Sequence, residues 1–208
     1  MQILIVDDHP LLRQAVKRVV ELHFEALRVR EAKTADEAVQ IIRSEPVELA
    51  ILDIALPDDS GLTVLKRIKQ LRPETKCLIL TIHSEPQYLK LAMSLGADGY
   101  LTKESAPDEL REAIHALLAG RRFVTPTLAD ALDDAGSERV LQPDKLLSVR
   151  ELEVLTSLAK GRTVSQVAAQ LKLSVKTVST YRIRLLEKLQ LDTTAQLIRY
   201  AVDQRLVK

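Results

Sequence analysis

Short apolar runs alternate with amphipathic segments through the first 120 residues of the chain. The runs at 49–52 and 77–80 are continuously apolar, which is typical of strands covered on both faces of a parallel sheet. The full set of predicted strands is Ile3–Val6, Leu27–Glu31, Leu49–Leu52, Cys77–Thr81 and Gly99–Leu101. Because a helical pattern follows each strand, the sequence predicts an α/β domain with a doubly wound, five-stranded parallel sheet.

The amphipathic segments indicate which face each helix turns toward the sheet. Leu11, Ala15, Val19 and Leu22 recur at helical spacing and predict the buried face of the first helix. Four further helices are predicted from apolar positions within 38–42, 62–71, 89–95 and 110–118.

The pattern changes after residue 120. Gly and Pro punctuate a polar stretch at 121–144, which predicts a linker, with one short helix around Thr127–Ala135. From 145 to 208 no strand-like run remains, and Ser148, Thr163, Ser174 and Asp192 or Thr193 are suitable caps for four successive helices. We therefore expect a second, small all-α domain at 145–208.

Charge separates the same two regions. Residues 144–208 carry 12 Lys or Arg against 6 Asp or Glu, whereas residues 1–143 carry 18 against 23, so a net charge of +1 combines about +6 with −5. The basic region is a candidate for nucleic-acid binding. The single cysteine, Cys77, excludes a disulfide framework, and no apolar run is long enough to span a membrane. We expect a soluble, cytoplasmic protein without a membrane partner.

Polar side chains stand at the carboxyl ends of the predicted strands, where ligands bind in sheets of this kind. Asp7 and Asp8 end the first strand, Asp53 the third and Thr81 the fourth, while Lys103 follows the fifth. Three carboxylates at one edge repel each other and require a cation, and hard oxygen ligands suit Mg²⁺. A lysine and a threonine hydroxyl beside them suit an incoming anion.

These residues resemble a known family. The segments Asp7-Asp8-His9, Leu52-Asp53-Ile54-Ala55-Leu56-Pro57 with Gly61, Leu80-Thr81 and Tyr100-Leu101-Thr102-Lys103 are similar to the flavodoxin-like receiver domain of bacterial response regulators. The resemblance covers about residues 1–120. It implies that Asp53 accepts a phosphoryl group from the phosphohistidine of a sensor histidine kinase.

The resemblance also implies the other roles. Asp8, Asp53 and the backbone carbonyl of Ala55 would bind Mg²⁺, with Asp7 acting through a water. Lys103 and Thr81 would contact the phosphoryl group, and Tyr100 would be the aromatic of the switch. Ile82 departs from the small residue of many receivers, and we expect it to slow hydrolysis. The alternative is a pseudo-receiver that keeps only the fold, but such domains usually lack one of these groups.

A basic helix is predicted at 174–189. At 100° per residue, Val178, Leu185 and Leu189 share one stripe, while Lys176, Thr180, Ile183, Arg184 and Glu187 lie opposite. With the helix at 163–171 and a turn at Lys172-Leu173, this forms a helix-turn-helix whose second helix would enter the DNA major groove. Geometry alone equally allows a small bundle with a solvated basic face.

The motifs from Leu147 to Leu155 and from Leu173 to Leu189 resemble the LuxR-type DNA-binding domain, and the whole chain resembles response regulators of the NarL/FixJ class. Phosphate contacts are expected from Lys176, Arg184 and Lys188, and base contacts from Ser179, Thr180 and Ile183. Thr177 would bond to phosphate or to the domain's own backbone. In relatives of this class the last helix forms the dimer on DNA.

The sequence thus predicts a phosphorylation-activated transcriptional regulator, not an enzyme, that binds double-stranded DNA as a homodimer. RNA polymerase is a further candidate partner. One rival is an output domain that docks a protein or catalyses a reaction, which salt-dependent binding to duplex DNA would exclude. Another rival is a hydrolase with Asp53 as nucleophile, which stable stoichiometric labelling of Asp53 would oppose.

Overall fold

The fold was analysed in a computed structural model of the 208-residue chain. It describes residues 1–208 except 25, 106, 126–146, 148, 190, 205 and 208, and omits the side chains of 87 and 149. Two compact units divide between Gly136 and Ser137, and each is described by itself. The linker helix expected around Thr127–Ala135 lies outside the described residues, as does the cap expected at Ser148.

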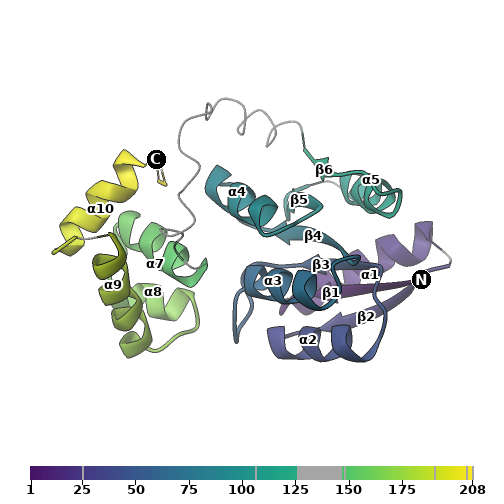
Figure 1. Cartoon of the computed structure of the whole chain (residues 1–208), viewed down its shortest axis with the longest axis horizontal. Helices are drawn as coiled ribbons and strands as arrows, with labels where there is room; N and C mark the ends of the chain where they lie inside the picture. Colours follow the sequence, from purple (N-terminus) through teal and green to yellow (C-terminus); the bar gives the residue numbers. More distant parts are fainter. Residues whose placement is uncertain are drawn as a thin grey trace. The chain divides into compact units, whose positions relative to one another are not determined.

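The first unit contains a six-stranded parallel sheet with strand order β2-β1-β3-β4-β5-β6 (Figure 1). The strands are β1 (Gln2–Val6), β2 (Arg28–Ala32), β3 (Leu49–Leu52), β4 (Lys76–Thr81), β5 (Gly99–Thr102) and β6 (Phe123–Val124). The helices are α1 (Pro10–His23), α2 (Ala35–Ser44), α3 (Gly61–Leu71), α4 (Pro86–Ser94) and α5 (Pro107–Leu118). The doubly wound α/β fold is confirmed.

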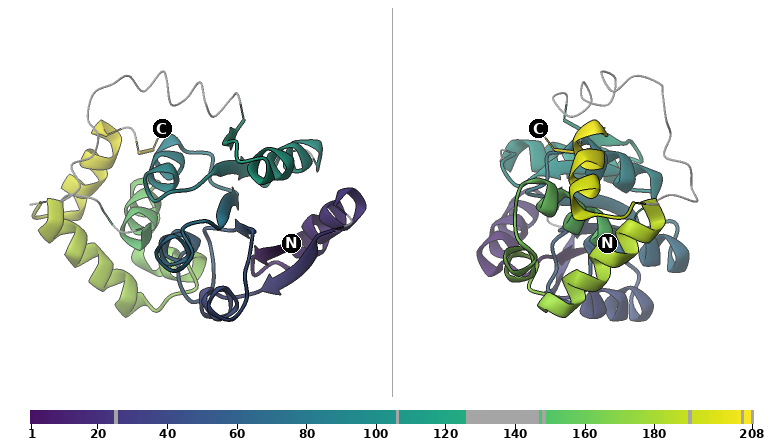
Figure 2. Two further views of the ribbon diagram at one scale, coloured as in Figure 1. Left: turned by 45° about the vertical axis from the view of Figure 1, so that its right-hand side comes forward. Right: turned by 90° about the vertical axis from the view of Figure 1, so that its left-hand side faces the viewer.

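Helices cover both faces of this sheet. Helices α1 and α5 lie on one face, and α2, α3 and α4 lie on the other, as two views agree (Figures 1 and 2). The central strands β3 and β4 are buried almost throughout, which explains their continuous apolar runs. Alternate residues of β1 and β3, such as Ile3, Ile5 and Ile51, pack in one core cluster with residues of α1 and α5.

Two expectations about this unit are wrong. The sheet has six strands, because Phe123 and Val124 pair with Gly99 and Tyr100 just inside the segment predicted to be a linker. A two-residue edge strand is too short to leave an alternating pattern. The buried face of α1 is also displaced by one position: Val16 and Val20 are buried, whereas Leu11 and Leu22 are 81% and 65% exposed. Both leucines lie at a helix end, where spacing alone does not show which face meets the sheet.

Asp98, just before β5, forms ion pairs and a hydrogen bond at the amino-terminal end of the sheet. Its carboxylate lies 2.8 Å from Lys69 Nζ and 3.3 Å from Lys76 Nζ, and it accepts a hydrogen bond from the amide of Cys77. Although burial acts to raise it, these bonds and charges hold the pKa of Asp98 below its ordinary value. The ionised carboxylate is therefore the form that the fold stabilises.

Asp98→Asn is expected to lower the free energy of unfolding by about 1–3 kcal/mol at pH 7, because the charged hydrogen bonds to two lysines are lost. A lowered folded pKa contributes stability above the unfolded value of about 4, and this contribution is lost as the pH falls through the folded pKa. The gap between wild type and variant should therefore close under acid in denaturant titrations. Asp108→Asn, at an 84% exposed side chain, serves as the control and should change stability by less than about 0.5 kcal/mol.

Helices are the regular secondary structure of the second unit in its described residues, and turns or loops connect them. Its elements are α7 (Val149–Ala159), α8 (Val164–Gln170), α9 (Val175–Leu189) and α10 (Thr194–Asp203). Thr163 caps α8 through reciprocal bonds with Gln166, as the sequence predicted, and of the two caps that it allowed for α10 the structure has Thr193, bonded in the same way to Gln196. The helices enclose one core cluster that includes Val167, Val178 and Leu185. None of the helices in the described ranges is long and apolar enough to cross a membrane.

Candidate functional site

The structure brings the acidic residues together at the carboxyl end of the sheet. Asp7 follows β1 and Asp53 follows β3, and these strands pair directly, with Val6 opposite Leu52. Asp7 and Asp53 are 3% and 2% exposed, and Asp8 is half-buried beside them. Strand pairing therefore positions carboxylates that stand more than 40 residues apart in the chain.

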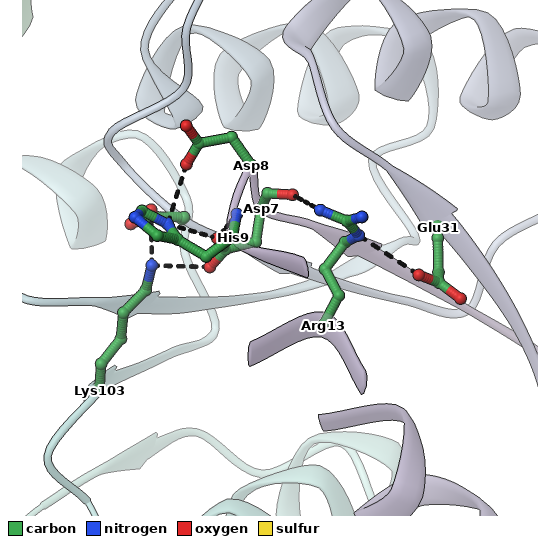
Figure 3. A network of polar contacts seen from close by, with 7 residues as sticks. Asp7, Asp8, His9, Arg13, Glu31 and Lys103 are labelled. Carbon is green, nitrogen blue, oxygen red and sulfur yellow. Dashed lines mark hydrogen bonds and ion pairs between the residues drawn. The ribbon is translucent and has the colours of Figure 1, made fainter. Parts of the chain in front are cut away.

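Lys103 joins two of these carboxylates. Its Nζ lies 2.7 Å from Asp7 Oδ2 and 2.7 Å from Asp53 Oδ2, and Figure 3 shows the lysine reaching up to the acid cluster. The lysine is held there because its amide donates to the carbonyl of Thr81, one residue beyond the paired ends of β4 and β5. Lys103 thus forms ion pairs with two of the three carboxylates of the site.

Electrostatics leave the cluster short of positive charge. Burial raises the pKa of Asp53 above its ordinary value, and Lys103 offsets only part of that effect. Burial acts to lower the pKa of Lys103, but the charges of Asp53 and Asp7 and the hydrogen bonds to both carboxylates together outweigh it, so the pKa lies above its usual value. Asp53 Oδ1 is buried and has no hydrogen-bond partner among the described residues. An unpartnered buried carboxylate oxygen is costly, so the site favours an added cation or donor.

Thr81 and Tyr100 line the neighbouring strands. Thr81 is buried at the end of β4, and its Oγ1 accepts a hydrogen bond from the amide of His83 at 3.4 Å. The Tyr100 side chain is buried, and its hydroxyl donates to the carbonyl of His83 at 2.7 Å. Burial raises the pKa of Tyr100, so the phenol stays protonated as a donor. The β4–α4 connection is therefore anchored by both residues.

Gly61, the first residue of α3, permits the chain to pass close to Asp53. A Cβ at this position would lie 1.8 Å from the Asp53 carbonyl oxygen and 2.7 Å from its carbonyl carbon. These are backbone atoms, which cannot turn aside as a flexible side chain would. The close approach fixes the loop that carries Asp53 and Ala55.

Gly61→Ala is expected to shift the Asp53 backbone, lowering stability by about 1–3 kcal/mol and phosphoryl labelling of the protein at least about tenfold. The measurement is labelling from a small phosphodonor beside a denaturant titration. Gly120→Ala is the matched control: its φ of 78° strains an alanine, but the new Cβ meets nothing within 4 Å. It should lose stability and keep its labelling, whereas equal labelling losses in both variants would oppose a local effect.

Helix α9 presents the predicted polar arc to solvent. Lys176, Thr180, Ile183, Arg184 and Lys188 are exposed, and Thr177 and Ser179 are half-buried. The exposed fraction of the Ile183 side chain is 51%, unusual for an isoleucine. The turn before α9 contains Lys172 in the left-handed region, at φ 53°. Helices α8 and α9 thus form the expected helix-turn-helix.

Several residues of this arc form hydrogen bonds or ion pairs within the second unit. Thr180 Oγ1 donates to the carbonyl of Lys176, so its oxygen remains as an acceptor. The Thr177 hydroxyl lies 2.7 Å from that of Ser174 at the start of α9. Lys188 Nζ lies 2.6 Å from Glu151 Oε2 of α7, so part of its charge is used within the domain. Lys176 and Arg184 are also exposed cations of this arc.

Comparison with known proteins matches both units. The response regulator receiver domain matches residues 3–115, and the luxR family of bacterial regulatory proteins matches residues 145–201. The response regulator UvrY of Escherichia coli is 33% identical over 97% of this chain and 94% of its own length.

The chain belongs to the NarL/FixJ class of response regulators. Among solved structures, RcsB from Salmonella enterica bound to a promoter with a phosphomimetic is 28% identical, with a TM-score of 0.61 over 96% of this chain and 97% of that one. A structure of two RcsB dimers on two parallel DNAs gives a TM-score of 0.63 and 27% identity, covering 97% and 98%.

Membership of this class assigns the general function. The response regulator carries a receiver and a LuxR-type DNA-binding domain, and it is a transcriptional regulator of a two-component system. The family is one of transcription regulators rather than a class of enzymes.

Sequence reasoning missed two residues at the receiver site of this response regulator. Arg13 is 6% exposed, donates to the carbonyl of Asp7 at 2.7 Å and lies 3.3 Å from Glu31, on the side of Asp7 away from Lys103 (Figure 3). The available signal was a charge at position 13 on the same helical stripe as Val16 and Val20. The other residue is His9, whose ring lies against the acid pair, although the sequence analysis assigned it no role beyond its place in the motif.

Proposed function

We propose that Asp53 is the phosphoacceptor and that the chain binds promoter DNA as a homodimer when Asp53 is phosphorylated. The observation that carries this proposal is the buried Asp53 carboxylate, which lies 2.7 Å from Lys103 and has one oxygen without a hydrogen-bond partner among the described residues. The phosphoryl donor is the phosphohistidine of a cognate sensor histidine kinase, and the reaction takes place in the cytoplasm.

The metal of the proposed site is Mg²⁺. The ligand atoms of Asp7, Asp8, His9 and Asp53 lie within 4.8 Å of one another, and the carboxylates supply the hard oxygen donors that Mg²⁺ prefers. Asp8, Asp53 and the carbonyl of Ala55 would hold the ion directly, and Asp7 would hold it through a water. When bound, the ion neutralises charge on the transferred phosphoryl oxygens.

The surrounding residues of the chain position the phosphoryl group. Lys103 pairs with it electrostatically, because its Nζ already lies between Asp7 and Asp53. Thr81 donates its hydroxyl to a phosphoryl oxygen, which requires it to move toward Asp53. Since Thr81 and Tyr100 both bond to His83, that movement reaches Tyr100 and the β4–α4 connection.

The proposed DNA interface is the exposed arc of α9. Lys176, Arg184 and Lys188 contact phosphates, Ser179, Thr180 and Ile183 contact base edges, and Thr177 supports the start of the helix. Dimerisation on DNA follows the RcsB complexes, and RNA polymerase is the partner through which promoter binding acts. The proposed limits are 1–120 for the receiver, 121–144 for the linker and 145–208 for the DNA-binding domain, although β6 extends the sheet into that linker.

A selection from random duplex DNA tests this function. It is carried out with the full chain, with and without beryllofluoride as a phosphoryl mimic. We expect the mimic to enrich a two-part site with half-sites about one helical turn apart, and two chains per duplex. Enrichment that is the same with and without the mimic would oppose the proposed switch.

Ile82 provides a prediction about the lifetime of the phosphorylated state. Its side chain directly follows Thr81 and is 69% exposed, at the end of the sheet where Asp53 lies. Ile82→Ala is expected to shorten the half-life of the phosphorylated protein about two- to fivefold, because a smaller side chain admits water more readily. Decay of labelled protein measures this, and equal half-lives in variant and wild type would refute it.

A further inference from the structure

Arg13 is a buried cation that the proposed reaction does not use. It lies on the stripe of α1 whose residues Val16 and Val20 pack in the core of the receiver unit. Burial of a guanidinium is unfavourable unless the charge is paired, and apolar side chains often stabilise such a position equally well or better. Packing alone therefore does not explain an arginine at this position.

The guanidinium of Arg13 connects the end of β1 to β2. Its Nη1 donates to the carbonyl of Asp7 at 2.7 Å, and its Nε donates to Glu31 Oε2 at 3.3 Å (Figure 3). The other oxygen of Glu31 lies 3.3 Å from Lys17 Nζ, one turn further along α1. Because a guanidinium presents its donors in a rigid plane, it holds both bonds in one fixed geometry.

The bond to the Asp7 carbonyl acts on the peptide group that joins Asp7 to Asp8. Asp7 lies one residue beyond the positions of β1 that pair with β2 and β3. Its amide still donates to the carbonyl of Ala32 at 3.2 Å, while its own carbonyl accepts from Arg13. Since the atoms of a peptide group are coplanar, fixing this oxygen also fixes the direction in which the chain continues to Asp8. One buried side chain thus orients the backbone from which both carboxylates extend.

We propose that Arg13 is a positioning residue for the acid pair Asp7 and Asp8. It contacts neither the phosphoryl group nor the metal ion, and it holds the peptide between the two acids so that both carboxylates are in place before the ion binds. Ligand groups that are ordered in advance bind more tightly, because less conformational freedom is lost on binding. Glu31 takes part by orienting the guanidinium. This inference rests on the proposed phosphoacceptor site and adds the residues that maintain its geometry.

The test compares Arg13→Met with wild type in the full chain. Methionine fills much of the same space but has no donor for the Asp7 carbonyl. Calorimetric titration with Mg²⁺ alone should give a dissociation constant about tenfold higher in the variant, as is typical when a residue that orients metal ligands is lost. Labelling from acetyl phosphate should need about tenfold more Mg²⁺ for half-saturation and should keep its rate at saturating Mg²⁺ within about twofold.

Two further variants separate positioning from packing. Arg18→Met removes an exposed arginine from the same helix and should match wild type in both measurements. Glu31→Gln keeps Arg13 but removes the charge that orients it, so the Mg²⁺ dissociation constant should rise about two- to threefold. If Arg13→Met does not fold, Glu31→Gln decides the question: a raised dissociation constant supports the proposal, and an unchanged one contradicts it.

Two results would overturn the role of Arg13, and they differ in what they leave standing. If wild type, Arg13→Met and Glu31→Gln bind Mg²⁺ equally well, Arg13 has a purely structural role, even where the variants lose stability, and the proposed phosphoacceptor site is unaffected. If wild type neither binds Mg²⁺ nor depends on it for labelling, the proposed metal site is wrong, and the positioning role of Arg13 is wrong with it.

Discussion

Asp53→Asn is expected to abolish phosphoryl uptake, with labelling from a small phosphodonor such as acetyl phosphate reduced at least about a hundredfold. An amide has nearly the shape of a carboxylate but lacks the anionic oxygen that attacks phosphorus. The carboxylate is 2% exposed, and its position is held by β3 pairing and the close approach of Gly61. The variant should fold, because the substitution removes one charge from a crowded acid cluster and leaves Lys103 paired with Asp7.

Asp59→Asn is the matched control for this experiment. Asp59 is another acid of the loop that joins β3 to α3, but its Oδ1 accepts a hydrogen bond from the amide of Ser60. An asparagine keeps that acceptor, so labelling and thermal unfolding should both match wild type. If Asp53→Asn still takes up phosphoryl groups with one-to-one stoichiometry, the acceptor lies elsewhere and the proposed function is wrong.

The positions of these acids could be predicted because they depend on topology. In a parallel sheet the carboxyl ends of all strands meet at one edge, so Asp7 after β1 and Asp53 after β3 had to converge once the strands were recognised. The same reasoning placed Thr81 and Lys103 beside them. Once the strands pair in register, the sequence position of each of these residues largely determines where its side chain lies in the site.

The features that sequence reasoning missed depend instead on side-chain direction or on pairing between distant segments. Arg13 is buried against the carbonyl of Asp7 because its stripe of α1 faces the sheet, which the positions of Leu11 and Leu22 did not reveal. His9 could have pointed in any direction from an exposed helix start. The short strand β6 depends on tertiary pairing with β5 alone. Each needed three-dimensional contacts that hydrophobic periodicity does not encode.

The DNA interface gives a prediction of comparable size. Replacing both Lys176 and Arg184 with alanine is expected to weaken binding to duplex DNA about 10- to 100-fold at 100 mM salt. Both side chains are exposed on the arc of α9. Loss of two phosphate contacts should also reduce the slope of log affinity against log salt by about 2, since fewer counterions are released.

A control double variant that removes the same charge from the receiver unit distinguishes contacts between α9 and DNA from the effect of the protein's net charge. Arg43→Ala with Lys66→Ala removes one arginine and one lysine from exposed positions on α2 and α3 of the receiver unit. If α9 reads DNA through specific phosphates, this pair leaves both affinity and salt slope near wild type. Equal losses in the two double variants would mean that net charge alone attracts the DNA, and the proposed contacts at Lys176 and Arg184 would be wrong. The salt slope decides between these accounts because it counts neutralised phosphates.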